Sequence, residues 1–555
     1  MINGLTKVQD AAAFVQLTSA LEFPDGDASN FRNGSTYLGD HLELRRLQLW
    51  HTMKSLKSPA HSIKGRTAAG ATIMIASRLI TRCIDFAALV ILARLLSPQD
   101  FGLVAIAMSV IMIVEAIMEL PLGFALVALP ARTKSHYDTV FTLQLFRGLG
   151  LAIILLILAW PFSQIYNDHR LIWLICALSI APASRGLSSP RIIEFSIDFK
   201  FWPNLIVEVT GKLMALVLSV SSAWLTRSYW SLAIGTIASP VTMLVVSYIY
   251  APYLPVMSLR KWHDFAGYFR WTAFGQTIRA LVWQMDALTL GRFVNRFELG
   301  GFSMAANLTA LPGQIFVDQM MNPLLVAFSS VREDARRLTA AYQKSAISIV
   351  GLGLPIMVGM SINAELLVRL AFGEKWLAAA SIVRWLSWAT IPAFFTGPFV
   401  ALAVSLDRAR LCTRLVVIEL VIRFPLTLIG ILHYGIAGAI AARLVTALAI
   451  GGFAMLSVRE LIGLRVRDQL LGPWRPLISA VIMAVVIAPL EAWFGNVSEY
   501  YQLIVHLATI VAVGAAAYAS SMFLLWGLIG RPDGLESHVA SLFANGVQKV
   551  LRASR

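Results

Sequence analysis

The amino-acid sequence predicts an all-α polytopic membrane protein of about 14 transmembrane helices. We expect two six-helix lobes related by a parallel internal repeat, followed by two additional C-terminal helices. Of the 555 residues, 57% are hydrophobic and only 14% are charged, whereas roughly a quarter of the residues of a soluble domain are charged. Apolar runs of about 20 residues, the length that crosses a bilayer, recur along the chain. In addition, one short motif occurs twice, 198 residues apart.

Fourteen apolar segments are long enough to be considered as spans. They are residues 69–93, 102–129, 139–162, 170–190, 203–226, 229–250, 265–291, 299–325, 341–362, 378–404, 412–432, 435–458, 474–495 and 502–529. Such runs would leave more apolar surface than a soluble fold of this size could bury. Lipid must therefore cover much of it.

The distribution of basic residues predicts the orientation. If the N-terminus is cytoplasmic, most loop Lys and Arg residues, such as Arg185, Arg191, Arg336 and Arg337, fall on the inner side. This bias is typical of cytoplasmic loops and predicts that both termini are cytoplasmic. The net charge of +15 is spread over many short loops, so it does not predict a nucleic-acid partner.

The spans and the polar ends divide the chain into five parts. We expect a largely disordered cytoplasmic arm, two lobes, a pair of extra helices and a basic cytoplasmic tail. The corresponding ranges are 1–64, 65–260, 261–462, 463–530 and 531–555. Within the arm, residues 42–57 could form a basic amphipathic helix on the membrane, but a dispensable terminal segment is the favoured interpretation.

The repeated motif lies in the connections between helices one and two and between helices seven and eight. In each copy an Arg is followed six residues later by an acid, and two residues after that by a Gly. The copies are Arg94, Asp100 and Gly102, and Arg292, Glu298 and Gly300. Six helices separate the copies, so both lobes cross the membrane in the same sense. In parallel repeats of this kind the substrate site lies between the lobes.

Helices one and seven each direct an Arg and an Asp, seven residues apart, to one face. These polar faces comprise Arg78, Arg82 and Asp85 in helix one and Gln276, Arg279 and Asp286 in helix seven. A charge at mid-bilayer costs at least about 2.5 kcal/mol, so such faces are expected to avoid lipid. We expect them to line a shared wet cavity, and pairing between helices is the alternative.

Helices two and eight carry a second pair of related polar residues. Glu115 and Glu119 have the same four-residue spacing as Gln314 and Asp318, at an offset of 199 residues. These side chains are candidates for proton or ion coupling. Structural pairing and contact with the membrane surface from span ends are the alternatives.

The remaining motifs predict a transporter rather than an enzyme. Cys83, Cys176 and Cys412 are far apart and predict neither a metal site nor a disulfide. The sequence has no nucleotide-binding loop and no hydrolase motif. We therefore expect no cofactor and no metal, with transport driven by an ion gradient or by substrate concentration.

Three stretches carry a family resemblance: "LARLLSPQDFGLVAIAMSVI" (Leu92–Ile111), Met285–Pro312 and Met321–Ser345. They resemble Wzx-type oligosaccharide flippases, in the polysaccharide transporter branch of the multidrug/oligosaccharidyl-lipid/polysaccharide superfamily. The resemblance covers roughly residues 65–500. The chain departs from the family pattern at "MELPLGFAL" (Met118–Leu126) and in its long N-terminal arm.

The resemblance implies a bacterial inner-membrane protein with two lobes around a central cavity. It would move an undecaprenyl-diphosphate-linked glycan to the periplasmic leaflet by alternating access, for exopolysaccharide, O-antigen or lipopolysaccharide assembly. The polysaccharide polymerase and export machinery would be partners. Arg78, Arg82 and Arg279 would bind the diphosphate, since guanidinium groups bind phosphate bidentately.

The acids of the polar faces have three expected roles under this resemblance. They would balance the Arg charges, take up protons or bind sugar hydroxyls. They are Asp85, Glu115, Glu119, Asp286 and Asp318.

Three alternative functions remain at this point. A drug or cation antiporter of the same superfamily is disfavoured because cavity Arg residues would repel cations. A membrane glycan polymerase or ligase usually has a large periplasmic loop, which the sequence does not contain. A non-transporting scaffold would leave the paired Arg and Asp faces unexplained.

Overall fold

A computed structural model describes residues 60–120, 122–129, 132–198, 200–266, 269–494 and 500–530. Within these ranges every regular element is helical, as the predicted all-α class requires. The chain divides into two units, Met1–Ala69 and Gly70–Arg555, and the second is described below. The predicted amphipathic helix at 42–57, nearly all of the predicted arm and the basic tail at 531–555 lie outside the described residues.

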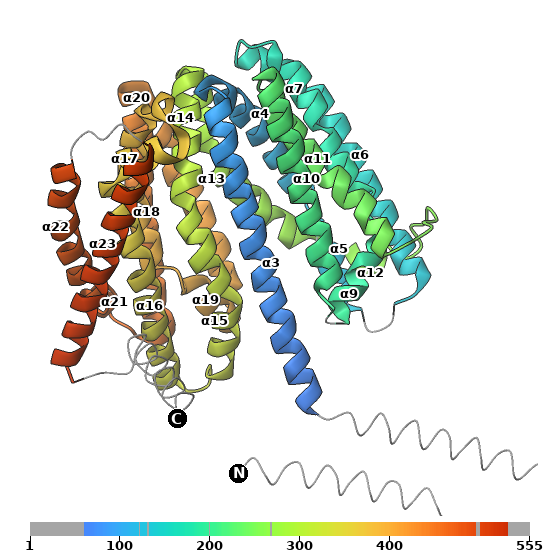
Figure 1. Cartoon of the computed structure of the whole chain (residues 1–555). Helices are drawn as coiled ribbons and strands as arrows, with labels where there is room; N and C mark the ends of the chain where they lie inside the picture. The colour runs from blue at the N-terminus through green and yellow to red at the C-terminus, as the bar shows by residue number, and fades with distance from the viewer. Residues whose placement is uncertain are drawn as a thin grey trace, which may run out of the picture. The chain divides into compact units, whose positions relative to one another are not determined.

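The division of Gly70–Arg555, which forms one compact unit, into two lobes stays a prediction. The predicted first lobe comprises the elements up to residue 250 (Figure 1). Its elements are α3 (Ala60–Leu95, of which the part from Gly70 belongs to the second unit), α4 (Pro98–Ile117), α5 (Leu122–Ala128), α6 (Lys134–Ile165), α7 (Arg170–Leu178), α8 (Ile180–Gly186), η1 (Pro190–Ile192), α9 (Ile193–Ile197), α10 (Trp202–Thr226) and α11 (Trp230–Tyr250).

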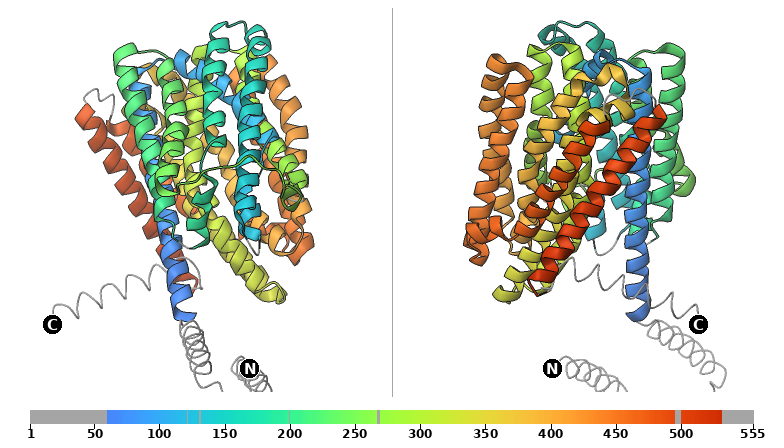
Figure 2. Two further views of the ribbon diagram at one scale, coloured as in Figure 1. Left: turned by 90° about the vertical axis from the view of Figure 1, so that its right-hand side faces the viewer. Right: turned by 60° about the vertical axis from the view of Figure 1, so that its left-hand side comes forward.

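The second lobe follows a linker at residues 251–262. Its elements are α12 (His263–Ala266), α13 (Phe269–Phe293), α14 (Arg296–Pro312), the π-helical turn η2 (Gly313–Val317), α15 (Asp318–Ser330), α16 (Ala335–Ile362), α17 (Ala364–Phe372), η3 (Glu374–Trp376), α18 (Ala378–Phe395), α19 (Phe399–Ser405) and α20 (Ala409–Ile462). After α21 (Val466–Leu471), the additional helices α22 (Trp474–Phe494) and α23 (Tyr500–Leu528) pair with each other, and α22 packs on α16 (Figure 2).

Each of the fourteen predicted segments coincides with a helix or a broken helix. Among the described residues, nine helices are long and apolar enough to cross a membrane, or ten if one bent pair forms a single span. The 54-residue α20 would be about 80 Å long if straight, far more than a bilayer needs. It reverses at Gly435, where φ is 56° and ψ is −133°, so it contains two of the predicted segments. The number of crossings stays a prediction.

Two predicted spans of the first lobe are broken in the structure. The segment predicted at 102–129 ends its first helix at Ile117 and continues as α5 from Leu122. The sequence has Pro121 at this break, and helices usually end before a proline. The segment predicted at 170–190 consists of short helices, with a bend of 59° between Arg170–Gly186 and Pro190–Ile197.

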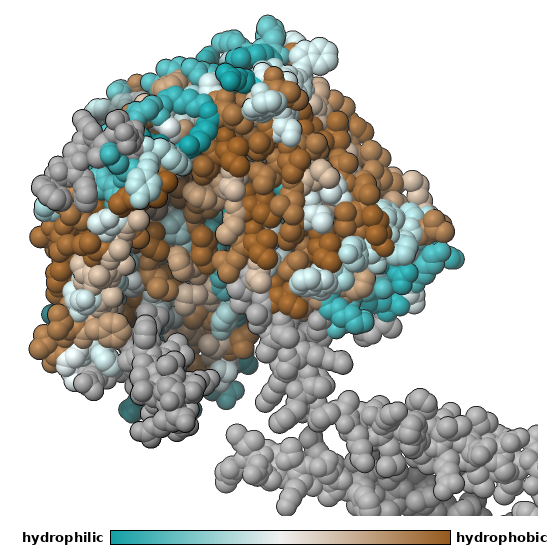
Figure 3. Space-filling view, viewed as in Figure 1, coloured by the Kyte–Doolittle hydropathy of each residue, from teal (hydrophilic) through white to brown (hydrophobic). Residues whose placement is uncertain are grey.

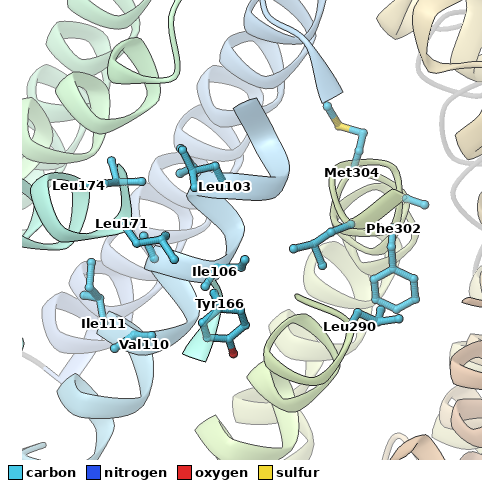
Figure 4. Packing of buried hydrophobic residues seen from close by; sticks show 14 of the residues in the cluster. Leu103, Ile106, Val110, Ile111, Tyr166, Leu171, Leu174, Leu290, Phe302 and Met304 are labelled. Atoms are coloured by element: carbon cyan, nitrogen blue, oxygen red, sulfur yellow. The ribbon is translucent and has the colours of Figure 1, made fainter. Parts of the chain in front are cut away.

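The main apolar core joins the two lobes through α4. This helix packs against α7 of its own lobe and against α13 and α14 of the other. Figure 4 shows Leu103 and Ile106 of α4 between Leu171 of α7 and the second-lobe residues Leu290 and Phe302, and all five belong to one buried cluster. Within a bilayer, helices are held together by close van der Waals packing rather than by removal of apolar surface from water, and this packing fixes α4 to both lobes.

The outer surface of the helices is largely apolar. On the face seen in Figure 3, hydrophobic residues form a broad band with hydrophilic residues above it and at its lower right. Exposed side chains within the helices include Ile153, Leu156 and Ile157 of α6. A band of this kind is expected where lipid covers the helices.

Candidate functional site

The two copies of the repeated motif meet where α4 packs on α14. A Cβ atom on Gly102 would overlap the carbonyl oxygen of Arg296, and one on Gly300 would overlap that of Pro98. Pro98 and Arg296 are themselves 198 residues apart, so the contact is reciprocal. Each added Cβ would also lie 3.1 Å from the backbone nitrogen of the opposite glycine. This reciprocity is what a two-fold relation between the lobes produces.

Each of the two crossing helices has a side-chain cap beside the acid of its motif copy. The Ser97 backbone nitrogen donates to the Asp100 carboxylate over 3.0 Å, and the Asp100 nitrogen donates to Ser97 Oγ over 3.4 Å. In the second copy, the Glu298 nitrogen donates to Asn295 Oδ1 over 2.8 Å. Caps satisfy otherwise unpaired amides, and acids are favourable at helix N-termini. Ser97 and Asp100 therefore help to define where α4 begins, and Asn295 does so for α14, whose first turn contains Glu298.

Arg94 of the first copy belongs to a first cross-lobe cluster with Ala93, Ala371, Lys375 and Trp376. The Arg94 Nε donates to the Ala371 carbonyl, at the end of α17, over 3.2 Å. From the second lobe, Trp376 Nε1 donates to the Ala93 carbonyl over 2.8 Å, and Lys375 Nζ donates to the Arg94 carbonyl over 2.9 Å. These bonds join the end of α3 to the segment between α17 and α18.

A second cross-lobe cluster contains Tyr166, Asp168, Leu288 and Arg296. The Tyr166 hydroxyl, beyond α6 of the first lobe, donates to the Leu288 carbonyl of α13 over 3.0 Å. Arg296 donates to the Tyr166 carbonyl over 2.8 Å and lies 3.7 Å from the Asp168 carboxylate. Arg292, the sequence equivalent of Arg94, is exposed. Arg94 is exposed as well, and in the second cluster the bonds between the lobes come from Arg296, four residues after Arg292.

The two clusters contain equivalent hydrogen bonds at equivalent positions of the two lobes. In each cluster, the donor is an aromatic side chain in the connection that follows the third predicted helix of one lobe. The acceptor is a backbone carbonyl near the end of the first helix of the other lobe. Trp376 and Ala93 form one such pair, and Tyr166 and Leu288 form the other. Both pairs lie at the predicted outer end, so bonds from both lobes close that end.

Charged groups at this end are perturbed by their surroundings. Burial opposes ionisation of Asp168, but hydrogen bonds from Arg170 and the charges of Arg170 and Arg296 outweigh it, so the Asp168 pKa lies below its ordinary value. Burial lowers the pKa of Lys375, although the nearby Asp100 acts in the opposite direction.

A polar cavity of about 550 Å³ lies within the second lobe. It is lined by parts of α13, α14, η2, α15, α18, α19 and α20. Its charged and amide-bearing lining residues are Arg279, Gln284, Asp286, Asn307, Gln314, Asp318, Glu419, Arg423 and Arg443. Four of the predicted site residues, Arg279, Asp286, Gln314 and Asp318, are therefore brought to one cavity.

The π-helical turn Gly313–Val317 shapes one wall of this cavity. It follows Pro312 and leads directly into Asp318, the first residue of α15. Turns of this kind are frequent at functional sites because they redirect side chains. The buried Gln314 Oε1 has no hydrogen-bond partner among the described residues, so this acceptor is available to a donor in the cavity.

The charges of arginines from both lobes act on Asp318. Arg78 of α3 donates to Gln319 Oε1 over 2.9 Å, which joins the first lobe to α15. The positive charges of Arg82, Arg78 and Arg279 all act on the Asp318 carboxylate. Arg residues of the first and seventh predicted helices thus act electrostatically on an acid of the eighth.

The two Asp residues of the polar faces have partners in their own lobes. Asp85 pairs with Lys212 of α10 over 2.7 Å. Asp286 accepts a hydrogen bond from Arg423 of α20, and Arg443 lies 3.8 Å from the same carboxylate oxygen. Asp85 is thus held in the first lobe, apart from the cavity that Asp286 lines.

These partners form a repeated pair that was not predicted. Glu208 and Lys212 have the same four-residue spacing as Glu419 and Arg423, 211 residues later. Glu208 accepts a hydrogen bond from Ser77 over 3.1 Å, and Arg423 lies 3.3 Å from Glu419. The sequence signal was a Glu followed by a basic residue one turn later in the fifth and eleventh spans.

The other predicted coupling residues lie in the first lobe. Glu115 forms an ion pair with Arg185 of α8, and Glu119 lies 3.3 Å from Arg147 of α6. Gln276 is exposed on α13. The structure does not bring Glu115 and Glu119 to the cavity that holds Gln314 and Asp318, and the roles of all these residues stay predictions. In the described part of the chain, no group of three or more His, Cys, Asp or Glu side chains could hold a metal ion.

Sequence comparisons identify relatives in polysaccharide assembly. The chain is 22% identical over 432 residues to the lipopolysaccharide biosynthesis protein WzxC of Escherichia coli, covering 75% of this chain and 85% of the relative. It is 24% identical over 311 residues to the succinoglycan biosynthesis transport protein ExoT of Rhizobium meliloti, covering 55% and 62% of the two chains.

Structural comparisons identify the fold. The lipid II flippase MurJ in an inward closed conformation superposes with a TM-score of 0.65, covering 82% of this chain and 99% of that one at 14% identity. An inward-facing multidrug resistance transporter of the MATE family gives a TM-score of 0.54, covering 70% and 98% at 14% identity. These similarities confirm the predicted all-α, multi-pass membrane fold.

The family model described as "Polysaccharide biosynthesis protein" matches residues 91–381. This range contains both copies of the repeated motif and most of the residues in the two cross-lobe clusters. Since the match covers more than half of the 555 residues, the chain belongs to the polysaccharide biosynthesis protein family.

Proposed function

We propose that this protein is a flippase for an undecaprenyl-diphosphate-linked oligosaccharide. It moves the glycan from the cytoplasmic to the periplasmic leaflet of the bacterial inner membrane, for exopolysaccharide, O-antigen or lipopolysaccharide synthesis. Family membership and the transport and lipopolysaccharide biosynthesis proteins among its relatives support this proposal. The fold shared with a lipid II flippase is compatible with such a cargo.

The observation that carries the proposal is the hydrogen bond from Arg78 to Gln319, next to Asp318, together with the charges of Arg78, Arg82 and Arg279 that act on the Asp318 carboxylate. Three guanidinium groups and one carboxylate leave an excess of positive charge. A diphosphate supplies anionic oxygens that guanidinium groups bind strongly, more so away from bulk water. An organic cation would be repelled by the same group, so the arrangement favours an anionic cargo over the antiporter alternative.

Asp318 has a defined role in this proposal. Without cargo, its carboxylate offsets part of the charge of the three arginines. When the diphosphate arrives, its oxygens take over that role, and Asp318 is released or protonated. Asp318→Asn should therefore strengthen the binding of the anionic headgroup but slow its release, since the competing charge is removed.

The closed outer end supports entry from the opposite side. The contact of Gly102 with Gly300 and the two cross-lobe clusters hold the lobes together at the predicted periplasmic end. In our proposal these contacts separate during transport and form again afterwards. The loop charge bias supports cytoplasmic termini. Export and polymerase machinery would receive the product.

Coupling to an ion or proton gradient is assigned to the acids of helices two and eight. Gln314 and Asp318 lie on the polar cavity, whereas Glu115 and Glu119 would act through their Arg partners in the first lobe. Substitution of each acid by its amide, with transport measured across a range of external pH, tests whether either pair responds to protons.

The test of the proposed function begins with deletion of the gene. We expect a lipid-linked oligosaccharide to accumulate in the cytoplasmic leaflet while surface polysaccharide is lost. The wild-type gene should reverse both effects. A normal leaflet distribution of the lipid-linked glycan in the deletion strain, despite lost polysaccharide, would overturn the proposal in favour of a role after flipping.

Arg82 provides the residue-level test. Arg82→Lys should retain part of the transport because a positive charge remains, whereas Arg82→Gln should lose it at normal membrane abundance. The matched control, Arg336→Gln, removes an exposed Arg at the start of α16 and should leave transport unchanged. If Arg82→Gln leaves binding of the anionic headgroup unchanged and the addition of Asp318→Asn restores transport, Arg82 only balances Asp318, and direct phosphate binding by Arg82 is excluded.

A further inference from the structure

The linker between α11 and α12 combines exposed apolar and basic side chains. Leu254 is 86% exposed and Met257 is 68% exposed. The exposed apolar residues of the linker are Leu254, Val256, Met257, Leu259 and Trp262. Arg260 and Lys261 are exposed in the same segment. In water, such apolar exposure would be unfavourable.

Hydrogen bonds to α6 hold the linker in place although its apolar side chains are exposed. The Val256 nitrogen donates to Asp138 Oδ1 over 3.0 Å, and the Ser258 nitrogen donates to Thr142 Oγ1 over 3.0 Å. The Tyr253 hydroxyl also donates to Asp138, over 2.5 Å. The linker therefore runs along the first turns of α6 (Figure 1, green trace beside the lower end of α6). Its apolar side chains remain exposed despite these bonds.

The length of α6 places this segment at the membrane surface. With 32 residues, α6 is about 48 Å long, whereas the hydrocarbon core is about 30 Å thick. If the helix is centred, about 9 Å, or roughly six residues, extends beyond the core at each end. Asp138 and Thr142, four and eight residues after the first residue of α6, then lie near the boundary of the core. The linker bonded to them is at the depth of the lipid headgroups.

A pocket of about 570 Å³ opens beside this linker. It is lined by Lys134 and Tyr137 of α6, Arg191 and Glu194 near α9, and Pro252, Tyr253 and Leu254 of the linker. The Arg191 Nε lies 3.2 Å from the Glu194 carboxylate. The positive charges of Arg132 and Arg191 both act on the Tyr137 hydroxyl. Three cations, Lys134, Arg132 and Arg191, and two acids, Glu194 and Asp138, therefore lie at or beside the pocket.

We propose that this pocket binds the headgroup of an anionic phospholipid, while the linker's apolar side chains lie against its acyl chains. The basic side chains complement the phosphate, and Leu254 and Met257 supply the apolar contact that a soluble anion could not use. The linker joins the two lobes, so the bound lipid holds the inter-lobe connection to the membrane surface. The Lys and Arg bias predicts that this surface is cytoplasmic, where anionic lipids attract basic segments.

The test uses the purified full-length protein and measures bound lipid by native mass spectrometry. Phosphatidylglycerol and phosphatidylcholine with identical acyl chains are offered at equal concentration. We expect wild-type protein to retain phosphatidylglycerol preferentially, and excess inorganic phosphate not to displace it. Lys134→Gln combined with Arg191→Gln should reduce its retention roughly tenfold, because two basic side chains near an anionic surface are removed.

The matched control combines Arg336→Gln and Arg410→Gln, which remove two exposed basic residues from the starts of α16 and α20. The control should retain phosphatidylglycerol at the wild-type level. Equal retention of the two lipids by the wild type, or an equal loss in both double variants, would overturn the proposal. Displacement by inorganic phosphate would assign the pocket to a soluble anion instead.

A second measurement does not depend on the double variant folding. A fluorescent label is attached to Met257→Cys in a background in which Cys83, Cys176 and Cys412 are replaced by Ser, and the protein is placed in lipid nanodiscs. Brominated acyl chains should quench this label strongly, whereas a label at Arg336→Cys should be quenched weakly. Weak quenching at residue 257 would show that the linker lies in water and would exclude the proposed site.

Discussion

The two lobes carry the same acid–base pair on equivalent helices but bury it to different degrees. In the first lobe, the side chains of Lys212 and Asp85 are 31% and 39% exposed. In the second lobe, those of Arg423 and Asp286 are 8% and 6% exposed. The spacing of the residues is repeated, so the difference lies in what surrounds each pair.

The difference in burial predicts that the first-lobe pair can be replaced at little cost, whereas the fold requires the second-lobe pair. We expect water rather than lipid to reach the first-lobe pair, since lipid would disfavour its charges; a pair screened by water contributes at most about 1 kcal/mol. A buried pair leaves an uncompensated charge when one partner is removed, which costs about 3–5 kcal/mol. We infer that the second lobe is the more rigid of the two around its pair, and that the pair in the first lobe can change partners during transport.

The largest expected effect comes from breaking the buried pair. Arg423→Gln would leave Asp286 and Glu419 without their shared guanidinium, with Arg443 at 3.8 Å as the nearest replacement. We expect a loss of about 3–5 kcal/mol of stability, seen as a large fall in the thermal midpoint and in membrane abundance. Lys212→Gln is the matched change in the first lobe and should cost no more than about 1 kcal/mol.

A double variant sharpens this comparison. Arg423→Gln combined with Asp286→Asn removes opposite charges together and should recover much of the lost stability, since the isolated buried charge is the source of the defect. Similar midpoints for Arg423→Gln and Lys212→Gln would contradict the inferred difference between the lobes.

The next largest effect is expected at the contact of Gly102 with Gly300, to which the two lobes contribute equivalent residues. Gly102→Ala would place a methyl group against the Arg296 carbonyl, and Gly300→Ala would place one against that of Pro98. Both obstacles are backbone atoms, so the helices must separate, at a cost of about 1–3 kcal/mol. We expect both variants to favour an open outer end to a similar extent, measured as labelling of a cysteine introduced at Leu299, which is buried in the wild type.

The control for this measurement is Gly275→Ala, because a Cβ atom there would meet nothing within 4 Å. It should leave labelling at residue 299 unchanged. If Gly102→Ala opens the outer end and Gly300→Ala does not, the reciprocal contact is not a shared closure of the two lobes.

The sequence predicts features that depend on neighbouring residues better than contacts between residues far apart in the chain. Apolar runs and the spacing of the repeated motif depend on neighbouring residues, and they predicted the all-α membrane fold. The pairing of Gly102 with Gly300 joins residues far apart in the chain, and the sequence showed only that they are equivalent. It did not show that they touch, because their contact depends on how α4 and α14 pack.

The polar residues show the same limit. A helical face predicts the direction of Arg78 and Arg82 but cannot specify the acid on which their charges act, which is Asp318. Asp85 was grouped with Arg82 because both lie on one face of a single helix. Its partner in the structure is Lys212, on another helix, and the four-residue spacing of Glu208 and Lys212 was the available sequence signal.

The smallest expected effect is a difference between the two cross-lobe clusters in how their contribution to stability depends on pH. Only the second cluster contains a carboxylate, that of Asp168, which lies 3.7 Å from Arg296. The Asp168 pKa is below its ordinary value in the folded protein, so its ionised form stabilises the fold at pH values above the ordinary carboxylate range. This contribution is lost as pH falls below about 4, through the lowered pKa.

Asp168→Asn isolates this contribution from other acid effects. Above about pH 5, the variant should be less stable than the wild type by roughly 1 kcal/mol, because a charge-assisted contact is lost. The difference in thermal midpoint between the two proteins should shrink as the pH is lowered towards 3, where the wild-type carboxylate becomes protonated. Arg94→Gln changes the first cluster, which lacks a carboxylate, and its difference from the wild type should vary less with pH. A constant difference between Asp168→Asn and the wild type would show that Asp168 acts through neutral hydrogen bonds, and the two clusters would then be electrostatically equivalent.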